Sequence, residues 1–271
     1  MAKWLLRSLN KLLSLFVMIA LVVTVLYAGF ALWDNRQIYA SAENGLSDMA
    51  PDSDLLETTG NADDNTVKET ETEEETELSK LFKRLKEVNP DIGAWVTMPG
   101  TNIDYPVVRG ENNIEYVSTD IYGNFAIVGS IFLDFRNQDD YSDIYNLLYG
   151  HNMSEHRMFS DVNLYKDEEF FNENQKGYFY LPTGAHWLQS ISIIVTNAGD
   201  SWLLNPNSWQ DQPTEKILEL VQKDALFISE DGMEALLAKI EAEEELHFVA
   251  LSTCSNEFTD ARTILLTLLD P

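Results

Sequence analysis

The sequence predicts a mainly β fold, an eight-stranded closed barrel, within residues 80–271. Eight short runs in this region are rich in β-branched and aromatic residues and are bounded by Gly, Pro, Asn or Asp, which is the pattern of strands. Helical periodicity is confined to three segments. Many short strands with few helices favour a closed barrel, because closure leaves no edge strand exposed.

The predicted strands follow one another along the chain, and turn signals separate them. Pro182, Thr183 and Gly184 form such a signal between two runs that we expect to pair. The last two runs are mostly apolar, so we place them centrally in the sheet. The eight predicted strands are 94–98, 103–108, 128–135, 145–149, 177–181, 186–196, 247–253 and 262–269.

The three helical segments are predicted at 79–88, 214–226 and 233–242. The first ends where Asn89 and Pro90 stop a helix. In the second, the apolar residues that share one face are Ile217, Leu218, Val221 and Leu226. The last two segments precede the penultimate strand, so that strand is reached through a helical connection.

Before the barrel, residues 12–33 form an uncharged, strongly apolar run. At about 1.5 Å per residue, a helix of this length crosses a hydrocarbon core of roughly 30 Å. The flanks predict its orientation, because three basic residues lie in segment 1–11 while Asp34 and Arg36 cancel after the run. The positive-inside rule then places segment 1–11 in the cytoplasm and the rest of the chain outside the cell membrane, as a single-pass protein.

A cleaved signal peptide is the alternative interpretation of this run. Ala40, Ser41 and Ala42 offer a small-x-small cleavage site. A signal-peptide core is usually about 7–15 residues, however, and this run is longer. We therefore favour a retained anchor.

The rest of the chain consists of two acidic segments that differ in composition. Residues 34–79 hold 14 acidic and 2 basic side chains with almost no large apolar groups, which predicts a disordered, self-repelling spacer. A recognition tail is the alternative for this segment. Residues 80–271 hold 31 acidic and 13 basic side chains, so we expect this domain to repel nucleic acid. Its length allows one substantial hydrophobic core.

Cys254 is the only cysteine of the chain and ends the apolar run 247–253. It cannot form an internal disulfide, so in an exported protein this thiol is either reactive or paired with another chain. Arg262 is the only Lys or Arg after Lys239. A nucleophile is one interpretation of this thiol. The alternative is a small, inert, buried residue, as many free cysteines are.

His151 follows the predicted strand 145–149 and Gly150. Functional side chains favour such loop positions at strand ends. An ordinary surface or capping histidine would also fit this position. The other three histidines are His156, in a polar loop, and His186 and His247, which begin predicted strands.

Several runs, in order, resemble class B sortases, the cysteine transpeptidases of the Gram-positive cell surface. The two signatures are residues 251–254 with Arg262, and residues 149–153 around His151. The runs 89–95, 99–108, 129–134 and 158–159 resemble other parts of class B enzymes. The resemblance covers essentially all of 80–271. It departs at Ala250, where the family usually has Thr, and at Asn256, where class B members often carry an acid.

The resemblance implies a fold and a reaction. The fold is the eight-stranded sortase barrel with an N-terminal helix and a helix-containing connection, here 213–245, before the cysteine strand. The reaction is cleavage of a C-terminal sorting signal after Thr in a secreted protein, through a thioacyl enzyme. The acyl group then passes to an amine of a peptidoglycan precursor or of a pilin lysine. No cofactor or metal is implied, and no cluster of metal ligands is visible in the sequence.

The implied catalytic residues are Cys254, His151 and Arg262, and their chemistry suits these roles. An imidazolium can lower the pKa of a neighbouring thiol and can later protonate a leaving amine. A guanidinium, always charged, can stabilise the oxyanion that forms when the thiolate attacks a carbonyl. Ser252 lies two residues before the cysteine and so on the same strand face, which predicts substrate contact or packing. The substrate-binding residues that we expect are Ser252, Thr253 and Asn152.

Two other functions remain possible from the sequence. One is a membrane-anchored extracellular binding or adhesion domain in which Cys254 is buried and inert. The other is a hydrolytic cysteine peptidase with the same three residues. Incorporation of an added amine distinguishes a transpeptidase from a hydrolase.

Overall fold

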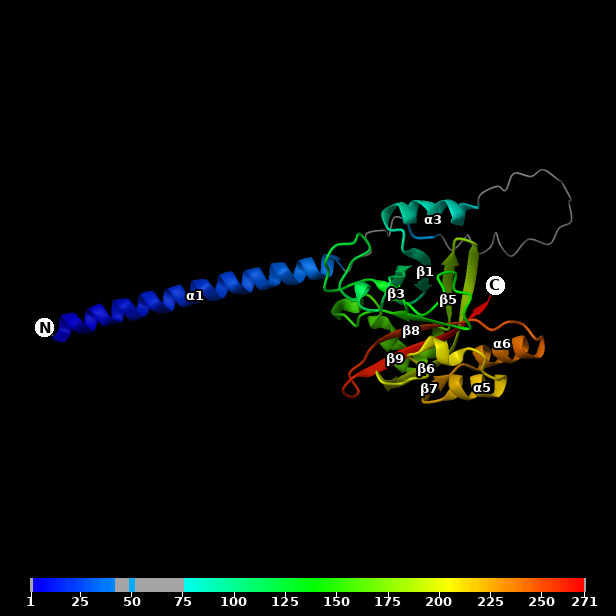
Figure 1. Cartoon of the computed structure of the whole chain (residues 1–271). Coiled ribbons are helices and arrows are strands. Elements are labelled where there is room, and N and C mark those ends of the chain that lie inside the picture. Colours follow the sequence, from blue (N-terminus) through cyan, green and yellow to red (C-terminus); the bar gives the residue numbers. More distant parts are fainter. Residues whose placement is uncertain (1, 42–48, 52–75, 271) are drawn as a thin grey trace. The chain divides into compact units, whose positions relative to one another are not determined.

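The structure is a computed structural model that describes residues 2–41, 49–51 and 76–270 (Figure 1). The chain divides into two units, residues 1–41 and 42–271, which are described separately. The first is the long helix α1 (Ala2–Ser41). Its stretch Lys11–Trp33 is long and apolar enough to cross a membrane, which is compatible with the predicted anchor.

The predicted spacer, residues 34–79, overlaps structured elements at both ends. Helix α1 continues to Ser41, and α3 (Glu77–Val88) begins before residue 80. Within the segment, Met49 and Ala50 are partly buried and pack against a hydrophobic cluster that includes residues of α3. The rest of the prediction concerns residues 42–48 and 52–75, which lie outside the described residues.

In the second unit, eight of the described strands close into a barrel, as predicted. Their order is β5-β1-β2-β3-β4-β8-β9-β6, and a β5–β6 pairing completes the ring. The β2–β3 and β4–β8 pairs are parallel and the others are antiparallel. The strands are β1 (Ile92–Met98), β2 (Ile103–Val108), β3 (Ile131–Leu133), β4 (Tyr145–Tyr149), β5 (Lys176–Leu181), β6 (Gly184–Asn197), β7 (Ala225–Ile228), β8 (Phe248–Cys254) and β9 (Ala261–Asp270).

Strand β7 is absent from the sequence prediction, which extended a helix over 214–226. The helix α5 (Thr214–Gln222) ends earlier, and Leu226 lies in β7 with 48% of its surface exposed instead of on the buried helix face. The length of β6 explains the added strand. The first half of β6 pairs with β5. Beyond that pairing, the same edge of β6 has no barrel partner from Ser192 to Ile194, and β7 pairs with it there. A turn at Asp224, with φ of 55°, separates α5 from β7.

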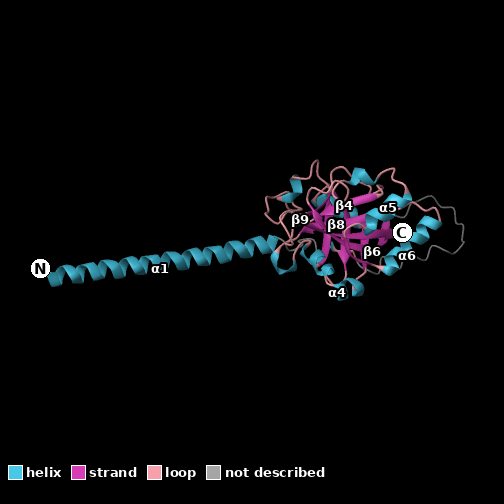
Figure 2. Cartoon of the chain, turned by 90° about the horizontal axis from the view of Figure 1, so that it is seen from below, coloured by secondary structure: helices cyan, strands magenta, loops and turns pink. Residues whose placement is uncertain are grey.

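Helices and loops surround the strands (Figure 2). Helix α3 begins at a cap in which the Thr76 side chain accepts a hydrogen bond from the Ser79 backbone, and it ends at Asn89. The short helix α4 (Glu168–Glu173) precedes β5, and α6 (Glu230–Glu241) precedes β8. The predicted helical connection before the cysteine strand is therefore confirmed.

Two hydrophobic clusters pack on the barrel. The N-terminal cluster joins α3 to β1, β2, β3 and β5, and the connection cluster joins the β6–β8 connection (residues 198–247) to β4, β6, β8 and β9. Partly buried Tyr149 packs against both clusters. The buried residues of the N-terminal cluster are Leu78, Leu81, Phe82, Leu85, Ile92, Trp95, Val108, Tyr116, Phe132, Tyr180 and Ala185. Those of the connection cluster are Tyr145, Leu147, Ile191, Ile194, Leu203, Trp209, Ile217, Leu220, Val221, Leu236, Phe248, Ala250, Ile264, Leu266 and Leu268.

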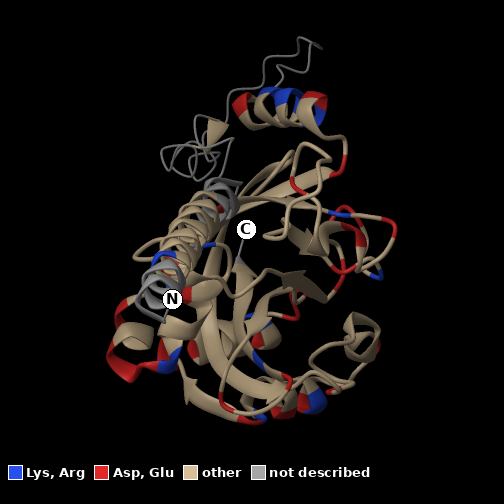
Figure 3. Cartoon of the chain, turned by 90° about the vertical axis from the view of Figure 1, so that its left-hand side faces the viewer, with Lys and Arg blue, Asp and Glu red and all other residues tan. Residues whose placement is uncertain are grey.

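Asp and Glu residues lie on several helices and loops around the barrel (Figure 3). The whole chain carries a formal net charge of −27. A charge of this size favours solubility and opposes contact with polyanions.

We expect Leu266→Ala to lower the free energy of unfolding by about 2–5 kcal/mol, because Leu266 is fully buried in the connection cluster and its removal leaves a cavity. Leu237→Ala is the matched control, since Leu237 is 43% exposed on α6. Urea denaturation of both variants checks this. Equal losses in the two would contradict the assignment of Leu266 to the core.

Candidate active site

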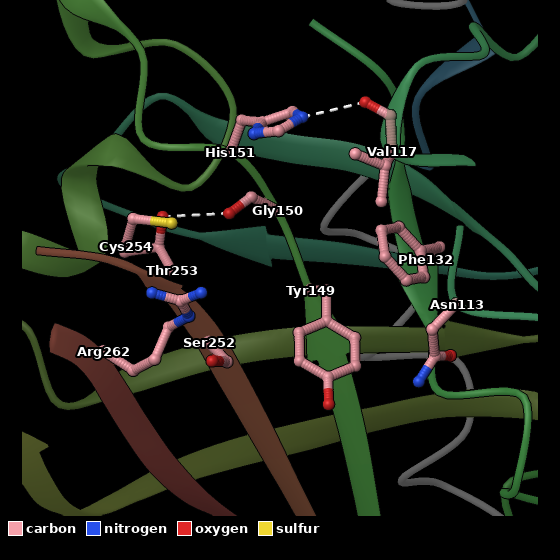
Figure 4. Close-up of a pocket in the computed structure, with 10 residues that line it drawn as sticks. All are labelled: Asn113, Val117, Phe132, Tyr149, Gly150, His151, Ser252, Thr253, Cys254 and Arg262. Carbon is pink, nitrogen blue, oxygen red and sulfur yellow. Dashed lines mark hydrogen bonds between the residues drawn. The ribbon is translucent and has the colours of Figure 1, made fainter. Parts of the chain in front are cut away.

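A cavity of about 300 Å³ opens where β4 and β8 end and β9 begins (Figure 4). It contains Cys254, His151 and Arg262, the three residues that the sequence predicts to be catalytic. Its lining residues are Asn113, Val117, Phe132, Tyr149, Gly150, His151, Ser252, Thr253, Cys254 and Arg262.

Strand register brings Cys254 and Arg262 together. They are directly opposite each other in the antiparallel β8–β9 pair, and opposed residues in such a pair present their side chains on one face of the sheet. Asn163 ties both strands at this point, since its Nδ2 donates to the Cys254 carbonyl at 3.4 Å and its Oδ1 accepts from Thr263 Oγ1 at 2.9 Å. Cys254 is exposed, which does not fit the alternative of a buried, inert thiol.

The parallel pairing of β4 with β8 brings His151 to the same place. Tyr149 lies opposite Ser252, and the Gly150 backbone N–H donates to the Ser252 carbonyl at 3.1 Å. Thr253 Oγ1 donates to the Gly150 carbonyl at 2.9 Å. His151 therefore follows β4 beside the end of β8, and the Cys254 sulfur lies between the imidazole and the guanidinium in the view of Figure 4.

Gly150 is required by close packing. A Cβ at this position would lie 2.5 Å from Ile131 Cδ1 and 2.6 Å from Phe159 Cγ. Cβ atoms essentially never come within 3 Å of such neighbours, so a larger residue would displace either the chain that carries His151 or the side chains of Ile131 and Phe159. The glycine between the strand and the histidine thus sets the position of His151.

The His151 ring is oriented by the backbone. Its Nε2 lies 2.8 Å from the Val117 carbonyl oxygen, which can only accept, so Nε2 carries the proton in this arrangement. The other nitrogen, Nδ1, lies on the side of the ring nearer Cys254 in Figure 4. Gly129, with φ of 59°, allows the chain just before β3 to lie close to Val117. A Cβ at Gly129 would lie 2.5 Å from the Val117 carbonyl oxygen.

The predicted substrate-binding residues divide into two groups. Ser252 and Thr253 line the cavity, whereas Asn152 is not among the lining residues and forms an isolated bridge with Met158. Ser252 Oγ is buried and has no hydrogen-bond partner among the described residues. The Thr253 hydroxyl already donates to Gly150.

The sequence prediction missed five lining residues, Asn113, Val117, Phe132, Tyr149 and Gly150. Tyr149 and Gly150 belong to the histidine signature, and Phe132 lies in a run that carries the resemblance, so motifs marked these three positions without assigning a role. Asn113 and Val117 lie in the β2–β3 connection, where no periodicity or motif signals a role. Only the fold shows that this connection reaches the cavity.

The loop between Cys254 and Arg262 is held by an ion pair between Glu257 and Lys166. Burial opposes ionisation of Glu257, but the ammonium group of Lys166 lowers the pKa of this carboxyl to about 2. Glu257 is not one of the described residues that line the cavity. No group of three or more His, Cys, Asp or Glu among the described residues is placed to hold a metal ion.

Comparison with known proteins shows the family of the chain. A solved class B sortase of Streptococcus pyogenes, involved in pilus biogenesis, is 33% identical to the chain, with a TM-score of 0.62 over 70% of this chain and 97% of that one. The chain belongs to the class B sortase family. Sortase B of Staphylococcus aureus is 26% identical over 179 residues, which are 66% of this chain and 69% of the relative.

Other solved sortases support the assignment. Sortase B of Clostridium perfringens is 28% identical to this sortase, with a TM-score of 0.59 over 70% of this chain and all of that one. A complex of S. aureus sortase B with substrate is 25% identical, with a TM-score of 0.60 over 70% of this chain and 85% of that one. No family model matches the sequence.

We expect Glu257→Gln to destabilise this sortase at pH 7 by about 0.5 kcal/mol or less, because the pair with Lys166 is partly exposed. The pKa of Glu257 is lowered in the folded state, so the pair stabilises the fold above the ordinary carboxyl pKa, and this contribution is lost as the pH falls toward 2. The difference between parent and variant should shrink accordingly in denaturation at pH 7, 4 and 3.

Lys166→Met and the double variant complete the test. If the two side chains stabilise each other, the double variant loses less free energy of unfolding at pH 7 than the sum of the losses in the two single variants. Additive effects at pH 7, or a difference that persists at pH 3, would contradict the ion pair as the cause.

Proposed function

We propose that this class B sortase is a cysteine transpeptidase in which Cys254 is the nucleophile, His151 the acid and base, and Arg262 the oxyanion-stabilising cation. The observation that carries the proposal is the presence of an exposed thiol, an imidazole and a guanidinium in one cavity. Each comes from the end of a different strand of the barrel. Convergence of three such groups from separate strands favours catalysis over packing.

The first half-reaction forms a thioester. His151 takes the thiol proton at Nδ1, and the Cys254 thiolate attacks the carbonyl carbon of the Thr in the sorting signal. The carbonyl oxygen becomes an oxyanion beside the positive charge of Arg262. When the adduct collapses, the C–N bond breaks and the leaving amine takes the proton from His151. The acyl group remains on Sγ.

The second half-reaction resolves the thioester. An acceptor amine attacks the same carbonyl carbon and gives a proton to His151, and the oxyanion forms again beside Arg262. The C–S bond breaks, the new amide leaves, and the thiolate is restored. No oxidant, metal or cofactor takes part in either half.

The proposed substrates are secreted proteins that carry a C-terminal sorting signal. The acceptor is an amine of a peptidoglycan precursor or of a pilin lysine. Two relatives support these choices, since the S. aureus enzyme is solved with its substrate and the S. pyogenes enzyme is involved in pilus biogenesis.

The proposed location is the cell membrane. Segment 1–11 would lie in the cytoplasm, 12–33 would form a single-pass anchor, and 34–79 would connect the anchor to an extracellular catalytic domain, 80–271. The apolar stretch within α1 supports the anchor, and the basic residues that precede it support the orientation.

We expect a thioester adduct on Cys254 when the full-length chain, in detergent, is mixed with a library of sorting-signal peptides and analysed by mass spectrometry. Added amine should convert the adduct to a ligated peptide, because attack by amine defines transpeptidation. Release of free acid in the presence of amine would favour the hydrolytic peptidase. Absence of any adduct, with a folded chain and an unreactive thiol, would favour the binding domain.

We expect Cys254→Ala to abolish adduct formation, because no other thiol exists in the chain. Arg262→Ala should slow it about 100- to 1000-fold through loss of the oxyanion's partner. His151→Ala should slow it about 100-fold or more through loss of the proton carrier. Arg84→Ala, on the exposed side of α3, is the control and should be as active as the parent. Full activity in one of the three site variants removes that residue from the mechanism.

A further inference from the structure

Asp134, the residue after β3, is fully buried next to the cavity without lining it. Its Oδ1 accepts hydrogen bonds from the backbone N and the Nε of Arg136, at 3.0 and 2.8 Å. Its Oδ2 accepts from Arg136 NH2 at 2.6 Å, from Asn113 Nδ2 at 2.8 Å and from Tyr149 OH at 3.1 Å. These donors occupy the acceptor positions of the carboxylate on both oxygens.

Two of these donors, Asn113 and Tyr149, line the cavity. They belong to separate parts of the chain, since Asn113 lies in the β2–β3 connection and Tyr149 ends β4. Both donate to the same oxygen of Asp134. Asn113 Oδ1 also accepts from the Phe135 backbone at 2.9 Å, so the amide is held at both ends. One buried oxygen therefore sets the distance between two walls of the cavity.

Arg136 completes the cluster and extends it. Its NH1 donates to Asn205 Oδ1 at 3.0 Å and its NH2 donates to the Leu204 carbonyl at 2.9 Å, both in the β6–β8 connection. Burial opposes ionisation of Asp134, but hydrogen bonds from Arg136 and Asn113 hold the pKa of this carboxyl below its ordinary value. Burial and the charge of Asp134 raise the pKa of Tyr149, which keeps its hydroxyl protonated as a donor.

We propose that Asp134 is a positioning residue for substrate binding, whose carboxylate holds Asn113 and Tyr149 as two walls of the peptide-binding cavity and joins them through Arg136 to the β6–β8 connection. The role rests on the proposed function, because it concerns the peptide that fills this cavity. Asp134 does not touch the reacting atoms. It acts through the two side chains that it holds.

A neutral amide cannot replace this carboxylate. An asparagine at this position has one acceptor oxygen and one NH2 group, so one of the two donor sets would face another donor. Either the paired contact of Arg136 or the hydrogen bond that Asn113 donates must be lost, whereas the Tyr149 hydroxyl can turn and accept from the amide. Asp134→Asn keeps the shape of the side chain, and so it tests the acceptor positions and the charge.

The test measures kcat and KM for adduct formation with the library peptide that reacts fastest with the parent. We expect Asp134→Asn to raise KM about tenfold, the effect of losing one hydrogen bond to a charged group, and to change kcat much less. Asn113→Ala and Tyr149→Phe should each raise KM as well. Combining either with Asp134→Asn should add little, because the carboxylate acts through these residues.

Two measurements separate positioning from loss of structure. The rate at which iodoacetamide alkylates Cys254 should be the same in Asp134→Asn and the parent, because the thiol and His151 are not held by Asp134. Asp139→Asn is the matched control, since Asp139 is exposed and lies, like Asp134, in the β3–β4 connection. The KM of this variant should equal that of the parent. If Asp134→Asn does not fold, Asn113→Ala and Tyr149→Phe decide the matter through their KM values.

Three results would overturn the proposal. The first is an unchanged KM in Asp134→Asn, or in both wall variants. The second is a loss confined to kcat together with slowed alkylation, which would place Asp134 in the chemistry or in folding. The third is strict additivity of the double variants. Failure of the proposed function looks different, because then the parent itself forms no adduct with any peptide.

Discussion

The parallel hydrogen bonding of β4 to β8 brings together two parts of the chain that are distant in sequence, and the site depends on it. The register is supported from inside by Asn146, a fully buried residue of β4 whose side chain donates to the Phe248 carbonyl at 3.3 Å and to the Asp143 carbonyl at 2.9 Å. A slip of one residue would turn every side chain of the slipped strand to the other face of the sheet. His151 and Cys254 would then no longer share a cavity.

The cavity is built between two packed regions. Tyr149 contacts both the N-terminal cluster and the connection cluster, and its ring lies 5.3 Å from that of Phe132, another lining residue. Groups that are held on several sides keep their positions before a ligand arrives, which lowers the entropic cost of binding. The proposed catalytic side chains lie at strand ends, where Cys254 is exposed and His151 and Arg262 are half-buried. The rigid side chains that line the cavity and the proposed reacting groups thus occupy different positions in the same region of the barrel.

Local pattern was sufficient to predict the eight barrel strands and the helices α3, α5 and α6, because each has a periodicity or a stop signal of its own, but it missed the short helix α4. It was insufficient for β7, since a strand that completes an edge is specified by the partner's unpaired backbone and not by its own residues. The predicted strand 128–135 is shortened to Ile131–Leu133, because Gly129 adopts a positive φ that ends regular pairing. Cys254 and His151 stood out through motifs. Asn113 could not, because its contact with Asp134 joins residues that only the folded chain brings together.

The solitary, exposed thiol of Cys254 has a consequence for redox chemistry. The chain contains no second cysteine, so any disulfide that it forms must join it to another molecule. If an oxidant converts the sulfur to a sulfenic acid, no thiol within the chain can resolve it, and recovery depends on a small thiol or a reductase from outside. Further oxidation to the sulfonic acid is irreversible. The exposure that suits Cys254 Sγ to the proposed attack on a peptide also leaves it open to oxidants, and no other thiol of the chain can reverse its oxidation.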